Sequence, residues 1–257
     1  MLQRMFLRLA VVMLMSFASW TATAAVNYQD MWWNANESGW GVNVAQQNNT
    51  MFATWFIYGT SNQPTWVVMS NAQRSGAGGN VFRGDIYTTT GPYFGLGVFN
   101  TASVTVSNPP VGVATFTFSD ARTGTLSYTV NGATVIKQIT RQPLESINLT
   151  GTYYGGIFRT ATCANSGVSN SIFSIAHTPS TSAITITEVG GNLCRFTGAL
   201  TQFGSIFEGN GTYTCQGESG TWTGAEGTGG ETAFSMKLSL QSGAGTCVST
   251  FGGFKSP

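Results

Sequence analysis

Hydrophobic and polar residues alternate along short stretches of this chain, and no segment shows a long apolar repeat with the 3.6-residue period of a helix. Alternation with a period of two places successive side chains on opposite faces of a strand. The stretches are rich in Thr, Val, Phe, Tyr and Trp, and Gly, Asn and Pro separate them. The pattern therefore predicts an all-β protein.

The alternating stretches form two series of about eight predicted strands. The first comprises 39–47, 50–58, 64–71, 80–89, 101–107, 111–118, 123–130 and 133–141, and the second 149–159, 170–177, 182–189, 192–203, 206–216, 219–226, 231–241 and 245–254. Polar residues and a proline interrupt the pattern between them. We expect two small antiparallel up-and-down barrels in tandem, avidin- or lipocalin-like in architecture: a Trp-rich barrel over 26–142, a linker over 143–148 and a four-cysteine barrel over 149–257.

A turn signal sets the register of one hairpin in the first series. In SYTVNGATV, the Asn131-Gly132 pair supplies the two positive-φ residues of a type I′ turn. Counting outward from this turn pairs Val130 with Ala133 and Tyr128 with Val135.

A second hairpin predicts how the four cysteines pair. It is centred on Gly204-Ser205, a Gly-first pair that fits a type II′ turn. The register places Cys194 opposite Cys215 at a non-hydrogen-bonded position, where opposing side chains lie closest. Elimination leaves Cys163 with Cys247, which joins the end of the first strand of this series to the start of the last.

The first 25 residues have the order of a secretory signal peptide: Arg4 and Arg8, an apolar run, then small residues up to a cleavage site near Ala24. We therefore expect export to the periplasm or the outside. An even number of cysteines agrees with an oxidising compartment.

Charge and metal-ligand composition exclude several classes of function. Without Arg4 and Arg8, nine basic residues face ten acidic ones, so we expect no nucleic-acid partner. No later stretch approaches about 20 apolar residues, and polar residues occupy the outward face of the Gly204-Ser205 hairpin, so we expect a protein that is not membrane-embedded. His177 is the only histidine and no C-x-x-C spacing occurs, so we expect no metal and no cofactor. We also expect His177, which ends the predicted strand at 170–177, to be a surface or loop residue.

Tryptophans in the first series are the strongest candidates for a binding site. The candidate ligand-binding residues are Trp32, Trp33, Glu37, Trp40, Trp55 and Trp66. Two interpretations stay open: the tryptophans plug the end of a small barrel, or they form a stacking platform for a glycan or a small apolar ligand. By alternation, Trp55 and Trp40 belong to one face of the strands.

Glu37 is the only carboxylate in this cluster. A glycosidase needs a second carboxylate across the scissile bond, and although Asp30, Asp85 and Asp120 are available, their spacing couples none of them to Glu37. We expect Glu37 to cap N–H groups near Ser38-Gly39 or to pair with Arg74 or Arg83, and we name no catalytic residue.

The order of several motifs resembles a widespread group of exported bacterial β-rich proteins. The motifs are WW-x3-ESGWG-x4-QQ, F-x-TW-x2-Y-G, P-x-W-x-VM, RG-x-IY-x-TTGP-x-FG and G-x-LSYTV-x-G, which together cover roughly residues 32–141. The second half, with LTGTYYGG and four cysteines, looks like a companion domain of similar exported proteins. The resemblance implies domain limits and export, and it implies no particular activity.

We expect an exported non-enzymatic protein for binding or surface interaction, with an aromatic site for a carbohydrate or a small apolar ligand. The alternative is a hydrolase of carbohydrate or cell-envelope material that uses Glu37 with a second carboxylate. Neither pattern nor composition determines the ligand or the oligomeric state.

Overall fold

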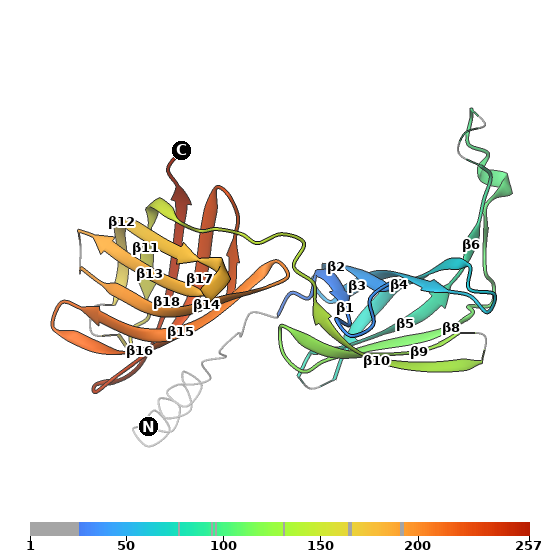
Figure 1. The fold of residues 1–257 in the computed structure, drawn as a ribbon. Coiled ribbons are helices and arrows are strands. Elements are labelled where there is room, and N and C mark those ends of the chain that lie inside the picture. Colours follow the sequence, from blue (N-terminus) through green and yellow to red (C-terminus); the bar gives the residue numbers. More distant parts are fainter. Residues whose placement is uncertain are drawn as a thin grey trace, which may run out of the picture.

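The chain forms two closed, eight-stranded antiparallel barrels in tandem (Figure 1). The computed structural model describes residues 26–76, 78–93, 95, 97–130, 132–163, 166–190 and 193–257. The signal peptide predicted over 1–25 lies outside the described residues. The expected all-β class and the tandem of up-and-down barrels are confirmed.

The first barrel closes through strand β1. Its strands are β1 (Asp30–Trp33), β2 (Gly41–Gln47), β3 (Thr50–Tyr58), β4 (Pro64–Ser75), β5 (Val81–Tyr87), β8 (Gly112–Phe118), β9 (Thr123–Val130) and β10 (Ala133–Arg141). Around the barrel they follow the order β1-β10-β9-β8-β5-β4-β3-β2. The register expected at Asn131-Gly132 is confirmed, since Val130 pairs with Ala133 and Tyr128 with Val135.

The predicted strand at 101–107 is wrong as a barrel strand. This segment holds the 3-10 helix η2 (Thr101–Ser103) and β7 (Thr105–Val106), which pairs with β6 (Thr89–Thr90) in a separate two-stranded sheet. The hairpin of β6 and β7 projects from the first barrel on the side away from the second barrel (Figure 1). The strand that completes the barrel is β1, which we did not predict because four residues are too few to show an alternation.

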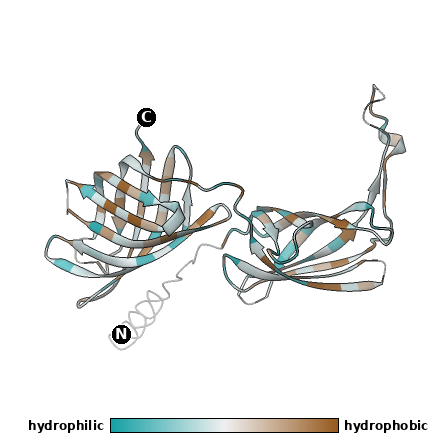
Figure 2. Ribbon diagram, viewed as in Figure 1, coloured by the Kyte–Doolittle hydropathy of each residue, from teal (hydrophilic) through white to brown (hydrophobic). Residues whose placement is uncertain are grey.

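Side chains fill the first barrel. The largest are aromatic and fully buried: Trp32, Trp55, Phe82, Phe116 and Phe118. The ring of Tyr28 stacks on that of Phe118 at 3.8 Å, and Trp55 meets Tyr128 edge-on at 5.7 Å. Eight strands enclose an interior just wide enough for side chains, so aromatic residues on the inward positions produce a packed core. Hydrophobic and hydrophilic positions alternate along the strands of both barrels (Figure 2).

The second barrel is a continuous meander. Its strands are β11 (Gly151–Arg159), β12 (Gly167–Thr178), β13 (Ala183–Val189), β14 (Arg195–Phe203), β15 (Ile206–Cys215), β16 (Glu218–Gly229), β17 (Ala233–Ser242) and β18 (Gly245–Lys255), with the 3-10 helix η3 (Pro179–Thr181) after β12. Strand β18 pairs with β11 and closes it. The register expected for the Gly204-Ser205 hairpin is confirmed by the pairing of Phe203 with Ile206, and Gly204 has a φ of +57°.

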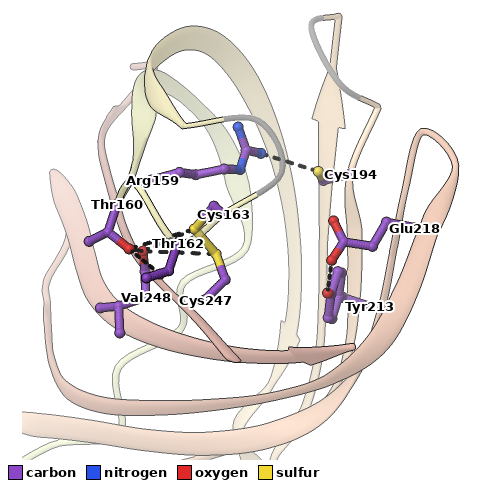
Figure 3. The surroundings of a disulfide bond; sticks show 9 residues. All are labelled: Arg159, Thr160, Thr162, Cys163, Cys194, Tyr213, Glu218, Cys247 and Val248. Carbon is purple, nitrogen blue, oxygen red and sulfur yellow. Dashed lines mark hydrogen bonds between the residues drawn. A yellow bond between two sulfur atoms is a disulfide. The ribbon is translucent and has the colours of Figure 1, made fainter. Parts of the chain in front are cut away.

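Two disulfides lie at the end of this barrel opposite the Gly204-Ser205 turn, and both predicted pairs are confirmed. They are Cys163–Cys247, which Figure 3 shows, and Cys194–Cys215. The first joins the segments that follow β11 and begin β18, where the barrel closes. The guanidinium of Arg159, 6% exposed, donates a hydrogen bond to the Sγ of Cys194 at 3.3 Å.

The expectation that His177 is a surface or loop residue is wrong. It belongs to β12, is 6% exposed, and its Nδ1 accepts a hydrogen bond from the backbone N–H of Leu149 at 3.3 Å. Alternation along β12 turns this position inward. Burial lowers the pKa of the imidazole, because the charged form would lose its hydration.

Polar contacts join the two barrels at the tip of the Gly204-Ser205 hairpin. The backbone N–H and the hydroxyl of Ser205 both donate to Oδ2 of Asp30, at 2.8 and 2.9 Å. The same oxygen accepts from Arg141, 2.8 Å away. A barrel-one residue, Arg122, lies 3.3 Å from the carboxylate of Glu208 in the second barrel. The hairpin tip of one barrel therefore sits on a buried ion pair of the other.

Candidate binding surface

The outer wall of the first barrel carries a row of aromatic side chains across strands β1 to β4. The inward positions Val42, Ala53, Trp55 and Val67 are buried, so their chain neighbours point outward. Phe56 pairs with Gly41 on one side and with Trp66 on the other. Because Trp32 pairs with Val42, Trp33 lies opposite Gly41, one residue further along.

The aromatic row thus consists of Trp33, Phe56 and Trp66, with Gly41 between the first two. Phe56 is 55% exposed and Trp66 47% exposed, whereas Trp33 is half-buried. Exposed Phe52 and Tyr58 lie on the same face of β3. Several large aromatic side chains clustered on the surface of a protein indicate a contact surface.

Gly41 leaves a notch in this row. Trp33 and Phe56 lie two strands apart, about 10 Å at the usual strand spacing, and the residue between them is the glycine. A Cβ at Gly41 would meet its nearest atoms at 3.6 Å and 4.0 Å, which are ordinary contact distances. A Cβ therefore fits at Gly41 without displacing the backbone, in contact with the end of the Met31 side chain.

The row Met31, Asn43, Thr54 and Val68 lies beside the aromatic row, since these residues pair across β1 to β4. Asn43 and Thr54 contribute an amide and a hydroxyl close to the aromatic rings. The surface therefore combines ring faces with neutral hydrogen-bonding groups.

Trp40 closes the nearby end of the first barrel. It packs partly buried against the core, and its Nε1 donates to Oε2 of Glu37 at 3.1 Å. The ammonium of Lys137 lies 2.6 Å from the same oxygen and 5.7 Å from the centre of the Trp40 ring. The Tyr58 hydroxyl donates to the carbonyl of Gly39 at 3.0 Å, which holds the loop onto β3.

The candidates predicted from the sequence thus separate into three groups. Trp32 and Trp55 have no exposed surface and belong to the core, so an external ligand cannot reach them. Trp40 and Glu37 form the closed barrel end. Trp33 and Trp66 are on the outer wall, where Phe56 and Gly41 join them. The sequence contained a signal for Phe56, because alternation places it opposite in direction to Trp55.

Glu37 has a different partner from those we expected. It pairs with Lys137, and neither Arg74 nor Arg83 contacts it. The hydrogen bond from Lys137, followed by that from Trp40, lowers the pKa of the Glu37 carboxyl. An ionised, paired carboxylate is unsuited to the role of general acid.

The carboxylates considered as partners for Glu37 lie elsewhere. Asp30 binds Arg141 and Ser205 at the junction with the second barrel, and Asp120 binds Arg122. Asp85 points outward from β5, four strands around the barrel from β1. The geometry gives the hydrolase alternative no second carboxylate at Glu37.

Within the described ranges, no group of three or more His, Cys, Asp or Glu side chains could hold a metal ion. Among the same residues, no helix has the length and apolar character needed to cross a membrane.

Comparisons with known proteins show distant similarity to solved structures alone. No protein-family model matches the chain, and no curated protein sequence matches it. Isotype 1 transferrin-binding protein B from serogroup B Neisseria meningitidis aligns with a TM-score of 0.33 at 9% identity, over 85% of this chain. The aligned region spans 66% of that protein, slightly less than two thirds of its length. A similarity at this level supports no inference about function.

Proposed function

We propose that this chain is a non-enzymatic carbohydrate-binding protein whose site is the aromatic row on the outer wall of the first barrel. The observation that supports the proposal is the placement of exposed Phe56 and Trp66 beside Trp33 across a bare glycine. We place the protein in the periplasm or outside the cell, where its two disulfides are stable.

The chemistry of the aromatic row fits a sugar better than a purely apolar ligand. Ring faces of Trp and Phe pack on the apolar C–H face of a sugar ring and are rigid, so binding costs little side-chain entropy. Gly41, between Trp33 and Phe56, has no side chain of its own to keep a sugar ring away from the sheet. Asn43 and Thr54, in the next row, are within the same surface and can exchange hydrogen bonds with hydroxyl groups.

A binding assay with two surface variants tests the proposal. Titration of the mature protein with a panel of soluble oligosaccharides, followed by tryptophan fluorescence and calorimetry, should reveal at least one ligand. We expect Trp66→Ala and Phe56→Ala each to weaken binding about fivefold, the effect of losing one aromatic contact. Tyr154→Ala is the matched control, because Tyr154 is 55% exposed on the outer wall of the second barrel.

Gly41→Leu probes the notch separately. A Cβ at this position meets its neighbours only at ordinary contact distances, so the fold should be retained while the notch is filled. Loss of binding in this variant supports the proposal. Binding of an apolar fluorescent probe but of no sugar, abolished by the same variants, would assign the site to apolar ligands instead. If the wild type, Trp66→Ala and Gly41→Leu proteins bind sugar equally, the proposed binding site is contradicted.

A further inference from the structure

A polar groove lies next to the aromatic row, where strand β4 bulges. Met69 pairs with Ile86 and Gln73 with Arg83, so the segment of β4 between these pairs is one residue longer than the opposing segment of β5. The bulge also interrupts the pairing of β4 with β3. Asn71, at its centre, has a φ of +56°. Such a bulge separates the strands locally and turns extra side chains outward.

The groove at the bulge has a volume of about 670 Å³. Its walls bear the polar side chains of Asn71, Gln73, Arg83 and Asp85, together with the ring of Tyr87. The Nε2 of Gln73 donates to Oδ1 of Asn71 at 2.7 Å, which orients both amides. A hollow with several hydrogen-bonding side chains and one aromatic ring has the composition of a ligand subsite.

Arg83 and Asp85 differ from the other charged side chains of the first barrel. Within the described part of this barrel, every other charged side chain has a hydrogen-bond or ion-pair partner. These side chains are Asp30, Glu37, Arg74, Asp120, Arg122, Lys137 and Arg141. No such partner occurs for Arg83 or Asp85 in that part of the chain. In the described part of the first barrel, the two charged side chains without such a partner thus both line the groove.

The groove is continuous with the aromatic row. Val68 follows Trp66 on the outward face of β4 and pairs with Tyr87 of β5. Trp66 and Tyr87 are therefore diagonal neighbours on adjacent strands, a relation that places such residues about 7–8 Å apart. A ligand of two or three sugar units is long enough to contact both.

We infer that the groove is a subsite that binds the hydroxyl groups of the sugar through hydrogen bonds, with Arg83 and Asp85 as the specificity-determining residues. This inference rests on the proposed function. The carboxylate of Asp85 accepts hydrogen bonds from adjacent hydroxyls, and the guanidinium of Arg83 donates to ring and hydroxyl oxygens. The two charges cancel, so the groove matches a neutral sugar unit rather than a uronic acid or another anionic sugar.

The test compares short and long sugars with neutral and acidic ones. For a wild-type protein that binds neutral oligosaccharides, Arg83→Gln and Asp85→Asn should each weaken binding of a trisaccharide about tenfold or more, as expected for a charged hydrogen bond. Binding of the corresponding monosaccharide, which contacts the aromatic row alone, should change less than twofold. Arg195→Gln, an exposed arginine of the second barrel, is the matched control. Unchanged circular dichroism and melting should accompany these surface substitutions.

Three outcomes would contradict the inference in different ways. If Trp66→Ala weakens trisaccharide binding while Arg83→Gln and Asp85→Asn do not, the groove is not a subsite, although the proposed function stands. If the wild type prefers acidic over neutral oligosaccharides, the assignment of a neutral sugar is wrong. If the wild type binds no oligosaccharide at all, the proposed function fails and the subsite fails with it.

Discussion

Trp32 and Trp66 belong to the same barrel but have opposite surroundings. Trp32 has no exposed surface, and its Nε1 donates to the carbonyl of Tyr28 at 2.9 Å. Trp66 is 47% exposed on β4. The first contributes to stability through burial, and the second is available for contact with a ligand.

Alanine substitution should separate these two roles. We expect Trp32→Ala to lower the free energy of unfolding by roughly 3–5 kcal/mol, since it opens a large cavity in the core. Trp66→Ala should change this free energy by no more than about 0.5 kcal/mol. Chemical denaturation followed by circular dichroism measures both, and similar losses in the two variants would contradict the assignment.

Glu37 should make the barrel end sensitive to acid. Because Lys137 and Trp40 lower its folded-state pKa below the ordinary value, the charged carboxylate stabilises the closed end above that value. This contribution is lost as the pH falls through the lowered folded-state pKa. An acid titration of the wild type, followed by tryptophan emission, should show a transition at the pH of this lowered pKa.

The transition should be absent from Glu37→Gln, which cannot titrate, and from Trp40→Phe, which lacks the reporting indole. A transition that persists in Glu37→Gln would assign it to another group. Oligosaccharide binding near neutral pH should be the same in Glu37→Gln and the wild type, because the aromatic row does not include Glu37.

At the scale of elements, the disulfides constrain the second barrel to different degrees. Cys163–Cys247 closes a separation of 84 residues, from β11 to β18, whereas Cys194–Cys215 closes one of 21 residues within a single hairpin. The longer loop loses more conformational entropy in the unfolded chain when it is cross-linked.

The double variant Cys163→Ala/Cys247→Ala should therefore be less stable than the double variant Cys194→Ala/Cys215→Ala. Loop-closure entropy predicts losses of about 4–5 kcal/mol for this pair and about 3 kcal/mol for Cys194→Ala/Cys215→Ala. Urea denaturation of both variants checks the order. A larger loss from the hairpin disulfide would show that the local contacts of Cys194, including Arg159, outweigh the chain entropy.

At the scale of the whole molecule, the junction sets how the two barrels lie relative to each other. A Cβ at Gly204 would collide with the Asp30 carboxylate and with the Arg141 side chain. Gly204→Val should therefore push the hairpin tip off the first barrel. Small-angle scattering should then report a larger radius of gyration and greater flexibility between the barrels.

Gly217 provides a matched control for this prediction. It also has a positive φ, +78°, and no atom lies within 4 Å of a Cβ built there. Gly217→Val has a comparable backbone cost without touching the first barrel, so its radius of gyration should equal that of the wild type. The same radius in Gly204→Val and Gly217→Val would show that the hairpin tip does not hold the barrels together.

Local patterns in the sequence determined a large part of this fold. Alternation identified the strands that face a core, two Gly-containing turns set the registers of their hairpins, and the second register predicted both disulfides. These features depend on neighbours in the chain or on a tight turn, so the sequence contains them. Strand β1 was not predicted, because its four residues are too few to show an alternation, and its pairing with β10 joins residues far apart in the sequence.

Only the tertiary structure determined which of the candidate residues lie on the binding surface. The sequence grouped the tryptophans, but only barrel closure separated buried Trp32 and Trp55 from exposed Trp66. The pairing of Glu37 with Lys137 joins residues 100 positions apart, and the groove with Arg83 and Asp85 depends on a bulge in register. Such contacts depend on how strands that are distant in the sequence pair around a barrel, and the local alternation of residues does not predict them.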